Sequence, residues 1–240
     1  MLSAFNITKS YNSRIVVNNI SLSVNEGEIV GLFGPNGAGK TSSFYIIIGF
    51  IKPDRGKVVL DREDITNLPM FMRARKGITY LPQEPSVFRK MSVEDNLISI
   101  LEFYGLDNQA IRKKVDELLE AFKLDHLAKN TAESLSGGER RRLEIARALM
   151  VSPRFMLLDE PFSSIDPLSI SELKKIIKGL KKRNIGILLS DHNVRESLPL
   201  CDRAYVINNG KLLLEGPPEA IANDRTVREI YLGEEFYIDA

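Results

Sequence analysis

The sequence predicts an α/β protein with a parallel sheet, an antiparallel sheet at one edge and an inserted helical segment. Two observations carry this prediction. Short apolar runs alternate with longer amphipathic stretches along most of the chain, which is typical of parallel strands buried under helices. The alternation stops between about residues 85 and 150, where helical patterns dominate and no convincing buried strand occurs.

Four apolar or nearly apolar runs are the predicted parallel strands. Each is bounded by polar residues, glycine or proline, as expected of strands buried on both faces. The runs cover residues 29–33, 78–81, 155–158 and 185–189. Two half-polar segments nearer the N-terminus, residues 15–24 and 57–60, suit the antiparallel sheet.

Helical spacing is clearest in residues 115–122 and 168–180. In the second segment apolar side chains share one face and lysines cover the rest. Asp166 and Pro167 suit the N-cap and the first position of this helix. We therefore assign a core to residues 1–84 and 151–240, and an inserted helical subdomain to residues 85–150.

Composition excludes several classes of protein. The 240 residues include 33 basic and 32 acidic ones, a balance that argues against nucleic-acid binding by bulk charge. A single cysteine can form neither an intrachain disulfide nor a multi-thiolate metal site, and it fits a reducing compartment. No apolar run approaches the ~20 residues that span a bilayer, and the N-terminus lacks a secretory signal pattern. We expect a cytoplasmic protein that inserts no segment into a membrane.

A glycine-rich loop follows the first predicted parallel strand. Residues 34–41, GPNGAGKT, match the pattern G-x-x-x-x-G-K-[ST] and precede a helical stretch, which is the context that this motif requires. Backbone N–H groups of such a loop surround a phosphate chain, and the helix N-terminus adds a favourable dipole. We expect Lys40 to reach the β- and γ-phosphates of a nucleotide and the Thr41 hydroxyl to ligate Mg²⁺. The predicted loop contacts are Gly34, Pro35, Asn36, Gly37, Ala38, Gly39, Lys40 and Thr41.

Two acidic residues end the strand predicted at residues 155–158. Ligands of open α/β sheets bind at the carboxyl ends of the strands, so Asp159 and Glu160 should lie beside the glycine-rich loop. Asp159 is placed to hold Mg²⁺, usually through water. Glu160 is placed to orient and polarise an attacking water.

Two further strand ends carry polar groups. Gln83 follows the strand at residues 78–81 and could reach Mg²⁺ and the attacking water. His192 follows the strand at residues 185–189 and could donate a hydrogen bond to the γ-phosphate. A lone glutamine or histidine is more often structural. Four strand ends that converge on one place favour the functional interpretation here.

Residues 135–139, LSGGE, form a different motif. Ser136 and Glu139 have the spacing of a capping box, which indicates a well-capped helix start. Gly137 and Gly138 strip side chains from that helix start, which favours an anion site. The two interpretations are compatible. An enzyme with a single nucleotide has no need of a second phosphate site.

The set of motifs resembles the ATP-binding-cassette (ABC) ATPases over essentially the whole chain. This resemblance implies a P-loop NTPase core of the RecA-like type and a head-to-tail homodimer that binds ATP and Mg²⁺. It implies that Ser136, Gly137 and Gly138 close on the partner's nucleotide and that Asp166, with Ser164, lies on a loop crossing between the two sites. It further implies that Ser42 contacts the α-phosphate and that Tyr11 stacks on adenine, an ordinary core tyrosine being the alternative for Tyr11.

Several runs are similar to the ATPases of bacterial lipopolysaccharide exporters. They are LPQE at 81–84, FRK at 88–90, GGERRR at 137–142, DHNVRE at 191–196 and YLGE at 231–234. The resemblance implies transmembrane partner subunits and a peripheral place on the cytoplasmic face of the inner membrane. Departures are Ser42 and Ser43, where threonines are usual, and residues 163–165, SSI, in place of a commoner Ala-Gly-Val.

The expected docking surface for the transmembrane subunits is an apolar patch near Phe88. Its members are Val87, Phe88, Arg89, Met91 and Val93. The alternative is that these residues are buried inside the helical subdomain. We interpret the charges of residues 140–142 and 174–183 as solvated helix faces.

Other functions stay open at this point. A cassette of a branched-chain amino-acid importer has a similar length and general pattern. A soluble ABC ATPase acting on nucleic acid would carry long coiled coils, whereas the stretch between Gly34 and Leu135 shows no sustained heptads. A P-loop kinase or GTPase has no use for LSGGE.

Overall fold

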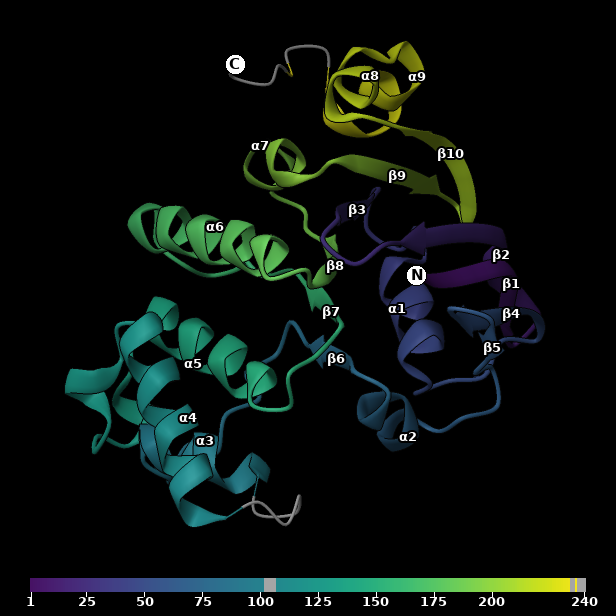
Figure 1. Cartoon of the computed structure of the whole chain (residues 1–240). Coiled ribbons are helices and arrows are strands. Elements are labelled where there is room, and N and C mark those ends of the chain that lie inside the picture. Colours follow the sequence, from purple (N-terminus) through teal and green to yellow (C-terminus); the bar gives the residue numbers. More distant parts are fainter. Residues whose placement is uncertain (102–106, 234–235, 237–240) are drawn as a thin grey trace.

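The structure is a computed structural model that describes residues 1–101, 107–233 and 236. Two β-sheets form its framework (Figure 1). A four-stranded antiparallel sheet has the order β2-β1-β4-β5, and a six-stranded sheet has the order β10-β9-β3-β8-β7-β6. The predicted α/β class, with a parallel and an antiparallel sheet, is confirmed.

The six-stranded sheet contains the four predicted parallel strands. These are β3 (Ile29–Phe33), β6 (Ile78–Leu81), β7 (Phe155–Asp159) and β8 (Gly186–Ser190). Two strands extend it beyond the prediction: β9 (Arg203–Asn208) runs parallel to β3, and β10 (Lys211–Gly216) runs antiparallel to β9. The antiparallel strand at the edge of this sheet therefore comes from the C-terminal part of the chain.

The antiparallel sheet is a separate layer. It consists of β1 (Leu2–Tyr11), β2 (Arg14–Val24), β4 (Arg55–Leu60) and β5 (Glu63–Asp64), of which β2 and β4 contain the predicted segments. Helix α1 (Lys40–Ile48) contacts strands of both sheets, and its buried Phe44 and Ile47 belong to a core that both sheets share. Helix α1 therefore packs against both sheets.

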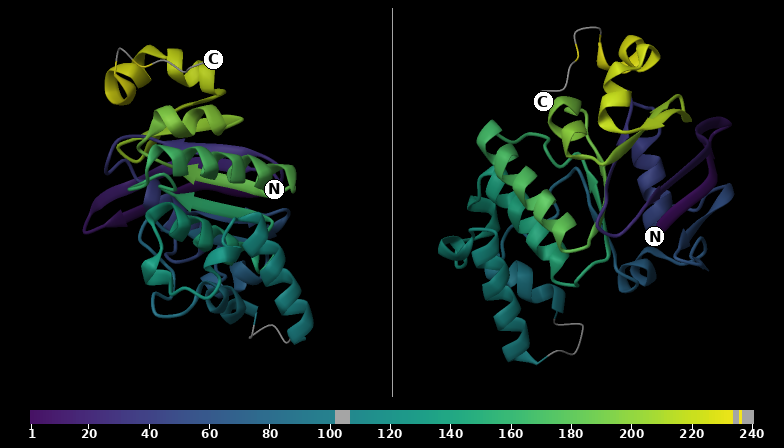
Figure 2. Two further views of the ribbon diagram at one scale, coloured as in Figure 1. Left: turned by 90° about the vertical axis from the view of Figure 1, so that its left-hand side faces the viewer. Right: turned by 45° about the horizontal axis from the view of Figure 1, so that its top comes forward.

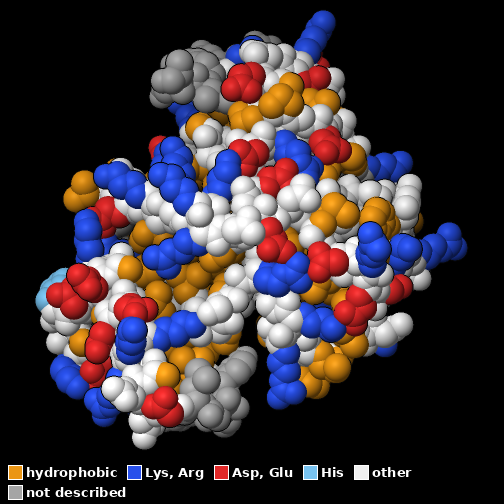
Figure 3. Space-filling model, viewed as in Figure 1, with side chains coloured by type: hydrophobic (Ala, Val, Ile, Leu, Met, Phe, Trp, Pro, Cys, Tyr) orange, Lys and Arg blue, Asp and Glu red, His pale blue; other side chains and the backbone are white. Residues whose placement is uncertain are grey.

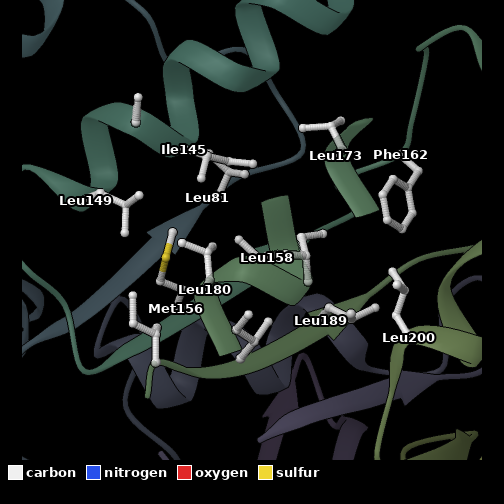
Figure 4. Packing of buried hydrophobic residues seen from close by; sticks show 14 of the residues in the cluster. Leu81, Ile145, Leu149, Met156, Leu158, Phe162, Leu173, Leu180, Leu189 and Leu200 are labelled. Atoms are coloured by element: carbon white, nitrogen blue, oxygen red, sulfur yellow. The ribbon is translucent and has the colours of Figure 1, made fainter. Parts of the chain in front are cut away.

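Side chains alternate between two cores along β7. Phe155 and Leu157 join the core around α1, while Met156 and Leu158 join the core under α5 (Gly137–Leu149) and α6 (Pro167–Lys182). Figure 4 shows Met156 and Leu158 beneath side chains of these two helices. Each fully buried aliphatic side chain of this kind stabilises the fold by about 1.5–3 kcal/mol. The apolar run therefore reflects burial on both faces of the sheet.

The chain between β6 and β7 is helical. It contains α3 (Val93–Leu101), α4 (Asn108–Ala121), the 3₁₀ turns η2 (Asp125–Leu127) and η3 (Ala132–Ser134), and α5. Helix α4 begins earlier than the predicted segment because the Asp107 side chain accepts from the N–H groups of Gln109 and Ala110. In α6 the predicted cap is present, with Ser169 N donating to Asp166 Oδ1 over 3.0 Å.

The remaining elements are short. They are α2 (Met70–Arg75), α7 (Val194–Ser197), η4 (Leu198–Leu200), α8 (Pro218–Asn223), α9 (Arg225–Val227) and the π-helical turn η5 (Arg228–Leu232). Figure 2 shows α8 and α9 at the opposite end of the molecule from the α3–α5 region. Among the residues that the structure describes, none of the helices combines the length and apolar character that a membrane crossing needs. Glu234 of the YLGE run lies outside the described residues.

Candidate active site

The candidate residues follow four neighbouring parallel strands. The glycine-rich loop follows β3, and His192 comes shortly after β8. Asp159 is the last residue of β7 and Glu160 is the next one. Gln83 comes shortly after β6. Because the order is β3-β8-β7-β6 and all four strands are parallel, these groups emerge from one edge of the sheet. The fold therefore brings the strand ends to the same side of the molecule.

Two glycines of the loop cannot be replaced without moving backbone. Gly34 has φ +145°, and a Cβ on it would lie 2.0 Å from the carbonyl oxygen of Ile207. Gly39 has φ +105°, and its Cβ would lie 2.4 Å from the carbonyl oxygen of Val16. Side chains are thus excluded at these two positions, where the loop packs closely against backbone of β9 and β2.

Lys40 is held inside the loop. Its side chain is buried, and Nζ donates to the carbonyl oxygens of Gly34 over 2.6 Å and Pro35 over 3.0 Å. Burial lowers the pKa of this amine, and the nearby carboxylates of Glu160 and Asp159 oppose that shift. A cation bonded only to neutral carbonyls at the start of a helix is a site that suits phosphate oxygens.

A cavity of about 310 Å³ opens in front of the loop. Loop residues 36–42, which include Asn36, Gly37, Ala38, Thr41 and Ser42, line it together with Glu160. Arg14 and Val16 of β2 form another wall. Arg14 was not predicted from the sequence, because a single arginine in a half-polar strand carries no signal of its own.

Tyr11 lies at the end of β1, paired across the sheet with Arg14. It does not line the loop cavity, and the residue is 46% exposed. The alternative that it is an ordinary core tyrosine is therefore wrong. Its role toward adenine stays a prediction.

Asp159 is buried with a donor on each carboxylate oxygen. The Tyr80 hydroxyl donates to Oδ2 over 3.1 Å, and the Ser190 hydroxyl donates to Oδ1. Burial, together with the Asp159 charge, raises the pKa of Tyr80, so this hydroxyl stays a donor. Within the described ranges no three His, Cys, Asp or Glu side chains form a group that could hold a metal alone. A Mg²⁺ ion at Asp159 would therefore depend on phosphate oxygens for further ligands.

Glu160 has one bonded and one unbonded oxygen. Oε1 lies 2.9 Å from His192 Nδ1, while Oε2 is buried without a hydrogen-bond partner in the described part of the chain. Burial raises the pKa of this carboxyl group, and the imidazole of His192 opposes the shift. Its backbone has φ +49° and is held by a bond from its N–H to the Ser190 carbonyl over 2.7 Å. A buried carboxylate with a free oxygen suits the role of general base.

His192 contacts Glu160, not the glycine-rich loop. Its side chain is half exposed, so one edge of the ring faces Glu160 while the rest is open to solvent. That His192 donates to a γ-phosphate stays a prediction. Its contact with Glu160 was not predicted from the sequence.

Asp191, which precedes His192, was not predicted as a site residue. It is fully buried, and its two oxygens accept from Asn193 N over 2.8 Å and Phe162 N over 3.0 Å. It thereby ties the turn after β8, which carries His192, to the segment after Glu160. Burial raises the pKa of Asp191. Tyr231 of η5 adds a contact from the C-terminal segment, with its hydroxyl 3.4 Å from the Asp191 carbonyl oxygen.

Arg141 is buried, so the interpretation of residues 140–142 as a solvated charge cluster is wrong for it. Its guanidinium pairs with Glu144 at 2.9 Å and donates to the Pro82 carbonyl at 2.8 Å. Further bonds reach the carbonyls of Asp159 at 3.1 Å and Glu160 at 3.2 Å. Arg141 of α5 therefore fixes the backbone at the ends of two neighbouring strands, β6 and β7, beside Gln83 and Glu160.

Gln83 is exposed and lines a different cavity, of about 250 Å³. Gly137 of α5 and Ser164 line the same cavity. Neither Gln83 nor residues 136–138 line the cavity of the glycine-rich loop. Within one chain, Gly137 of the LSGGE motif and Lys40 therefore line different cavities.

The start of α5 has the predicted capping box. Glu139 N donates to Ser136 Oγ over 3.3 Å, and Ser136 N donates to Glu139 Oε2 over 2.8 Å. These bonds lower the pKa of Glu139. Gly138 has a second reason to be glycine, because a Cβ on it would lie 2.1 Å from Ser169 Oγ on α6.

The predicted docking patch divides into two parts. Val87 and Val93 are buried in the core, so the prediction that they form an exposed patch is wrong. Phe88 is 49% exposed, and Arg89 is exposed as well. The buried Asn96 side chain accepts from Phe88 N over 2.8 Å and donates to Phe88 O over 3.0 Å, which fixes the backbone under this ring.

Comparison with known proteins places these features in a family. A family model described as ABC transporter matches residues 17–163, and one described as branched-chain amino acid ATP-binding cassette transporter matches residues 211–237. The lipopolysaccharide export system ATP-binding protein LptB of Haemophilus influenzae is 54% identical over 237 residues, covering 98% of each chain. The proteins of the same name from Acidithiobacillus ferridurans and Escherichia coli K12 are 52% and 50% identical, with 99% and 98% of each chain covered.

Solved structures agree with this assignment. A nucleotide-free ATP-binding cassette from an ABC transporter superposes with a TM-score of 0.88 at 32% identity, covering 98% of this chain and 99% of the other. An ATP-binding cassette in its ADP conformation gives a TM-score of 0.85 at 31% identity, with the same coverage.

Proposed function

Because this chain belongs to the ABC transporter family and is an ATPase subunit of that type, we propose that it drives a bacterial lipopolysaccharide exporter. The observation that supports the transported substrate is the 50–54% identity to lipopolysaccharide export ATP-binding proteins over nearly the full length of both chains. The observation that supports the chemistry is the free Oε2 of Glu160 beside the cavity of the glycine-rich loop.

In this proposal the loop binds the phosphates of ATP. Lys40 exchanges its two carbonyl partners for phosphate oxygens, and loop residues 34–42 surround the chain. Thr41, Asp159 and, from the neighbouring cavity, Gln83 would hold Mg²⁺, which would neutralise developing phosphate charge. Catalysis in such sites is mainly positioning and charge stabilisation.

Glu160 accepts the proton of the attacking water in this proposal. His192 orients the carboxylate through Oε1, so Oε2 is left to accept from water. Arg141 and Asp191 act as positioning residues, because they hold the backbone around Glu160 and His192 and reach no reacting atom.

The functional unit in this proposal is a head-to-tail homodimer. Ser136, Gly137 and Gly138 would contact the nucleotide of the partner, and Asp166 would lie on the connecting loop. The separation of the LSGGE motif from the loop cavity within one chain supports this arrangement. A site completed by a second copy explains why one chain carries two anion-binding motifs.

Transmembrane subunits would dock beside Phe88, which places the protein peripherally on the cytoplasmic face of the inner membrane. A groove of about 200 Å³ lies there between α2 and α5, lined by Met70, Ile100 and Arg147 among others. Arg147 also lies 5.3 Å from the centre of the Phe88 ring. Exposed apolar side chains continue over α2, where Phe71 is 61% exposed (Figure 3). A mostly apolar groove of this kind, with Glu144 and Arg147 as its charged lining residues, suits a short amphipathic helix.

The second candidate is the cassette of a branched-chain amino-acid importer. The match of residues 211–237 to the family model of that name favours it. Both candidates share the ATPase chemistry and differ in their membrane partners.

The deciding experiment is purification of the tagged full chain from its own membranes in mild detergent, followed by mass spectrometry of what accompanies it. We expect two six-helix subunits with large periplasmic domains. Amino-acid permease subunits would replace the exporter with the importer. Absence of any membrane protein, with ATPase activity retained, would contradict both and favour a soluble ABC ATPase.

A further inference from the structure

A cavity of about 300 Å³ lies away from the active site, between α6 and the C-terminal end of α4. Its floor is apolar, since Phe122 and Leu180 are buried and Ile176 packs against the same core. Figure 3 shows hydrophobic side chains in a hollow between α6 and α5, with basic side chains around it. Small-molecule sites commonly combine such a floor with a few polar groups.

The rim of this cavity is strongly cationic. Lys123, Arg142, Lys175 and Arg183 line it, and Glu172 is the single carboxylate among the lining residues. Glu172 accepts from Lys123 Nζ at 3.2 Å and also pairs with Arg142. In the described part of the chain, Lys175 and Arg183 form no ion pair. The rim therefore carries positive charge that protein carboxylates do not neutralise.

Arg142 lines the cavity and is largely buried. Its side chain is 12% exposed and pairs with Glu172 through Nη1. Its Nε is buried without a hydrogen-bond partner in the described residues. A buried N–H group without a partner is uncommon in folded proteins, so this guanidinium keeps hydrogen-bonding capacity that its ion pair with Glu172 does not use.

Gly179 leaves space in the cavity wall. It lies inside α6 and lines the cavity, and a Cβ on it would meet nothing within 4 Å. Glycine weakens a helix interior relative to alanine, and here no neighbouring atom requires it. The missing side chain of Gly179 leaves open volume beside the apolar floor of the cavity.

We propose that this cavity binds a small amphipathic anion, with an aromatic or aliphatic body on the Phe122–Leu180 floor and one carboxylate, sulfonate or phosphate group on the cationic rim. Such a ligand would touch the end of α4 and Arg142 of α5 on one side and α6 on the other. Its binding needs neither the glycine-rich loop nor a membrane partner. The test of this cavity is therefore independent of the proposed function.

The test is a fluorescence titration of the full chain with 8-anilino-1-naphthalenesulfonate, in saturating ATP and Mg²⁺ so that the nucleotide loop is occupied. We expect saturable binding that Gly179→Phe weakens about tenfold and Gly179→Ala leaves unchanged, because only the larger side chain fills the cavity. N-phenyl-1-naphthylamine, which has the same rings without the sulfonate, should bind about tenfold more weakly.

A second pair of variants keeps the test independent of repacking. Lys175→Glu reverses a rim charge and should weaken binding of the sulfonate several-fold, whereas Lys178→Glu changes an exposed lysine of the same helix outside the lining and should not. Three results would overturn the proposal: no saturable binding, equal binding by wild type and Gly179→Phe, or equal binding of the charged and neutral probes.

Discussion

His192 Nδ1 lies 2.9 Å from Glu160 Oε1, across the turns that follow the neighbouring strands β8 and β7. The second oxygen of Glu160 is buried and has no partner in the described residues. The two oxygens of one carboxylate are thus different, one fixed by an imidazole and one free to accept. The contact with His192 therefore orients the Glu160 carboxylate, which is the general base of the proposed mechanism.

Glu160→Gln removes the proton acceptor while keeping the size of the side chain. We expect ATP turnover to fall by about 10²–10⁴-fold, which is the usual contribution of a general base. Binding of ATP should persist, because Lys40 and the glycine-rich loop are unchanged. Phosphate release and equilibrium nucleotide binding measure the two effects.

The matched control is Glu120→Gln, since Glu120 is exposed on α4 far from the strand ends. It should turn over ATP at the wild-type rate. Unimpaired steady turnover by Glu160→Gln would remove Glu160 from the mechanism. With ATP present, this variant should also run as a dimer in size-exclusion chromatography.

The rate of hydrolysis should fall on the acid side of neutrality. Burial raises the pKa of Glu160 above its usual range, so the basic carboxylate form is lost at a higher pH than for an exposed glutamate. His192 opposes that shift, because its electrostatic interaction with Glu160 lowers the pKa of the carboxyl group. Replacing it in His192→Ala therefore raises the pKa of Glu160 further.

Profiles of kcat against pH check the direction of this change in the pKa of Glu160. The acid limb of His192→Ala should lie at higher pH than that of wild type. His126→Ala changes the other histidine of the chain, which is exposed on η2, and its profile should match wild type. An acid limb that stays in place in His192→Ala would show that the limb does not report on Glu160.

The parallel strands were predictable because burial on both faces leaves continuous apolar runs such as residues 155–158. Strand β1 was not, since register shifts between Ala4 and Ile7 and again before Ser10 interrupt the two-residue period. Strand β10 is an edge strand with exposed and half-exposed side chains, and its apolar run is only three residues long, at 212–214.

The site shows a similar division. Residues with a motif, such as Lys40 and Glu160, could be placed from local pattern because their chemistry depends on the strand end they follow. Arg141 could not, since its hydrogen bonds reach two separated backbone segments, at Pro82 and at residues 159–161, that meet it only in the folded chain. Asp191 was missed for the same reason, because its partners Phe162 and Asn193 belong to two different strand ends.

Arg141→Met should destabilise the fold by about 3–5 kcal/mol, because it leaves the buried carboxylate of Glu144 without its partner. Urea unfolding monitored by circular dichroism measures the change. Arg140→Met, one residue earlier on the same helix, should change stability by less than about 1 kcal/mol. Equal effects of the two variants would mean that the bonds of Arg141 contribute nothing specific.

Phe88→Ala should separate partner docking from catalysis. The ring is 49% exposed and its backbone is held by Asn96, so truncation removes apolar surface without disturbing the core. We expect the isolated variant to hydrolyse ATP within about twofold of wild type, since Phe88 lines neither the loop cavity nor the cavity that contains Gln83. Membrane subunits should be lost from the purified complex. Phe5→Ala truncates an aromatic ring that is 39% exposed on the antiparallel sheet, and it should retain them. If Phe88→Ala keeps its membrane subunits as fully as Phe5→Ala, the docking surface lies elsewhere.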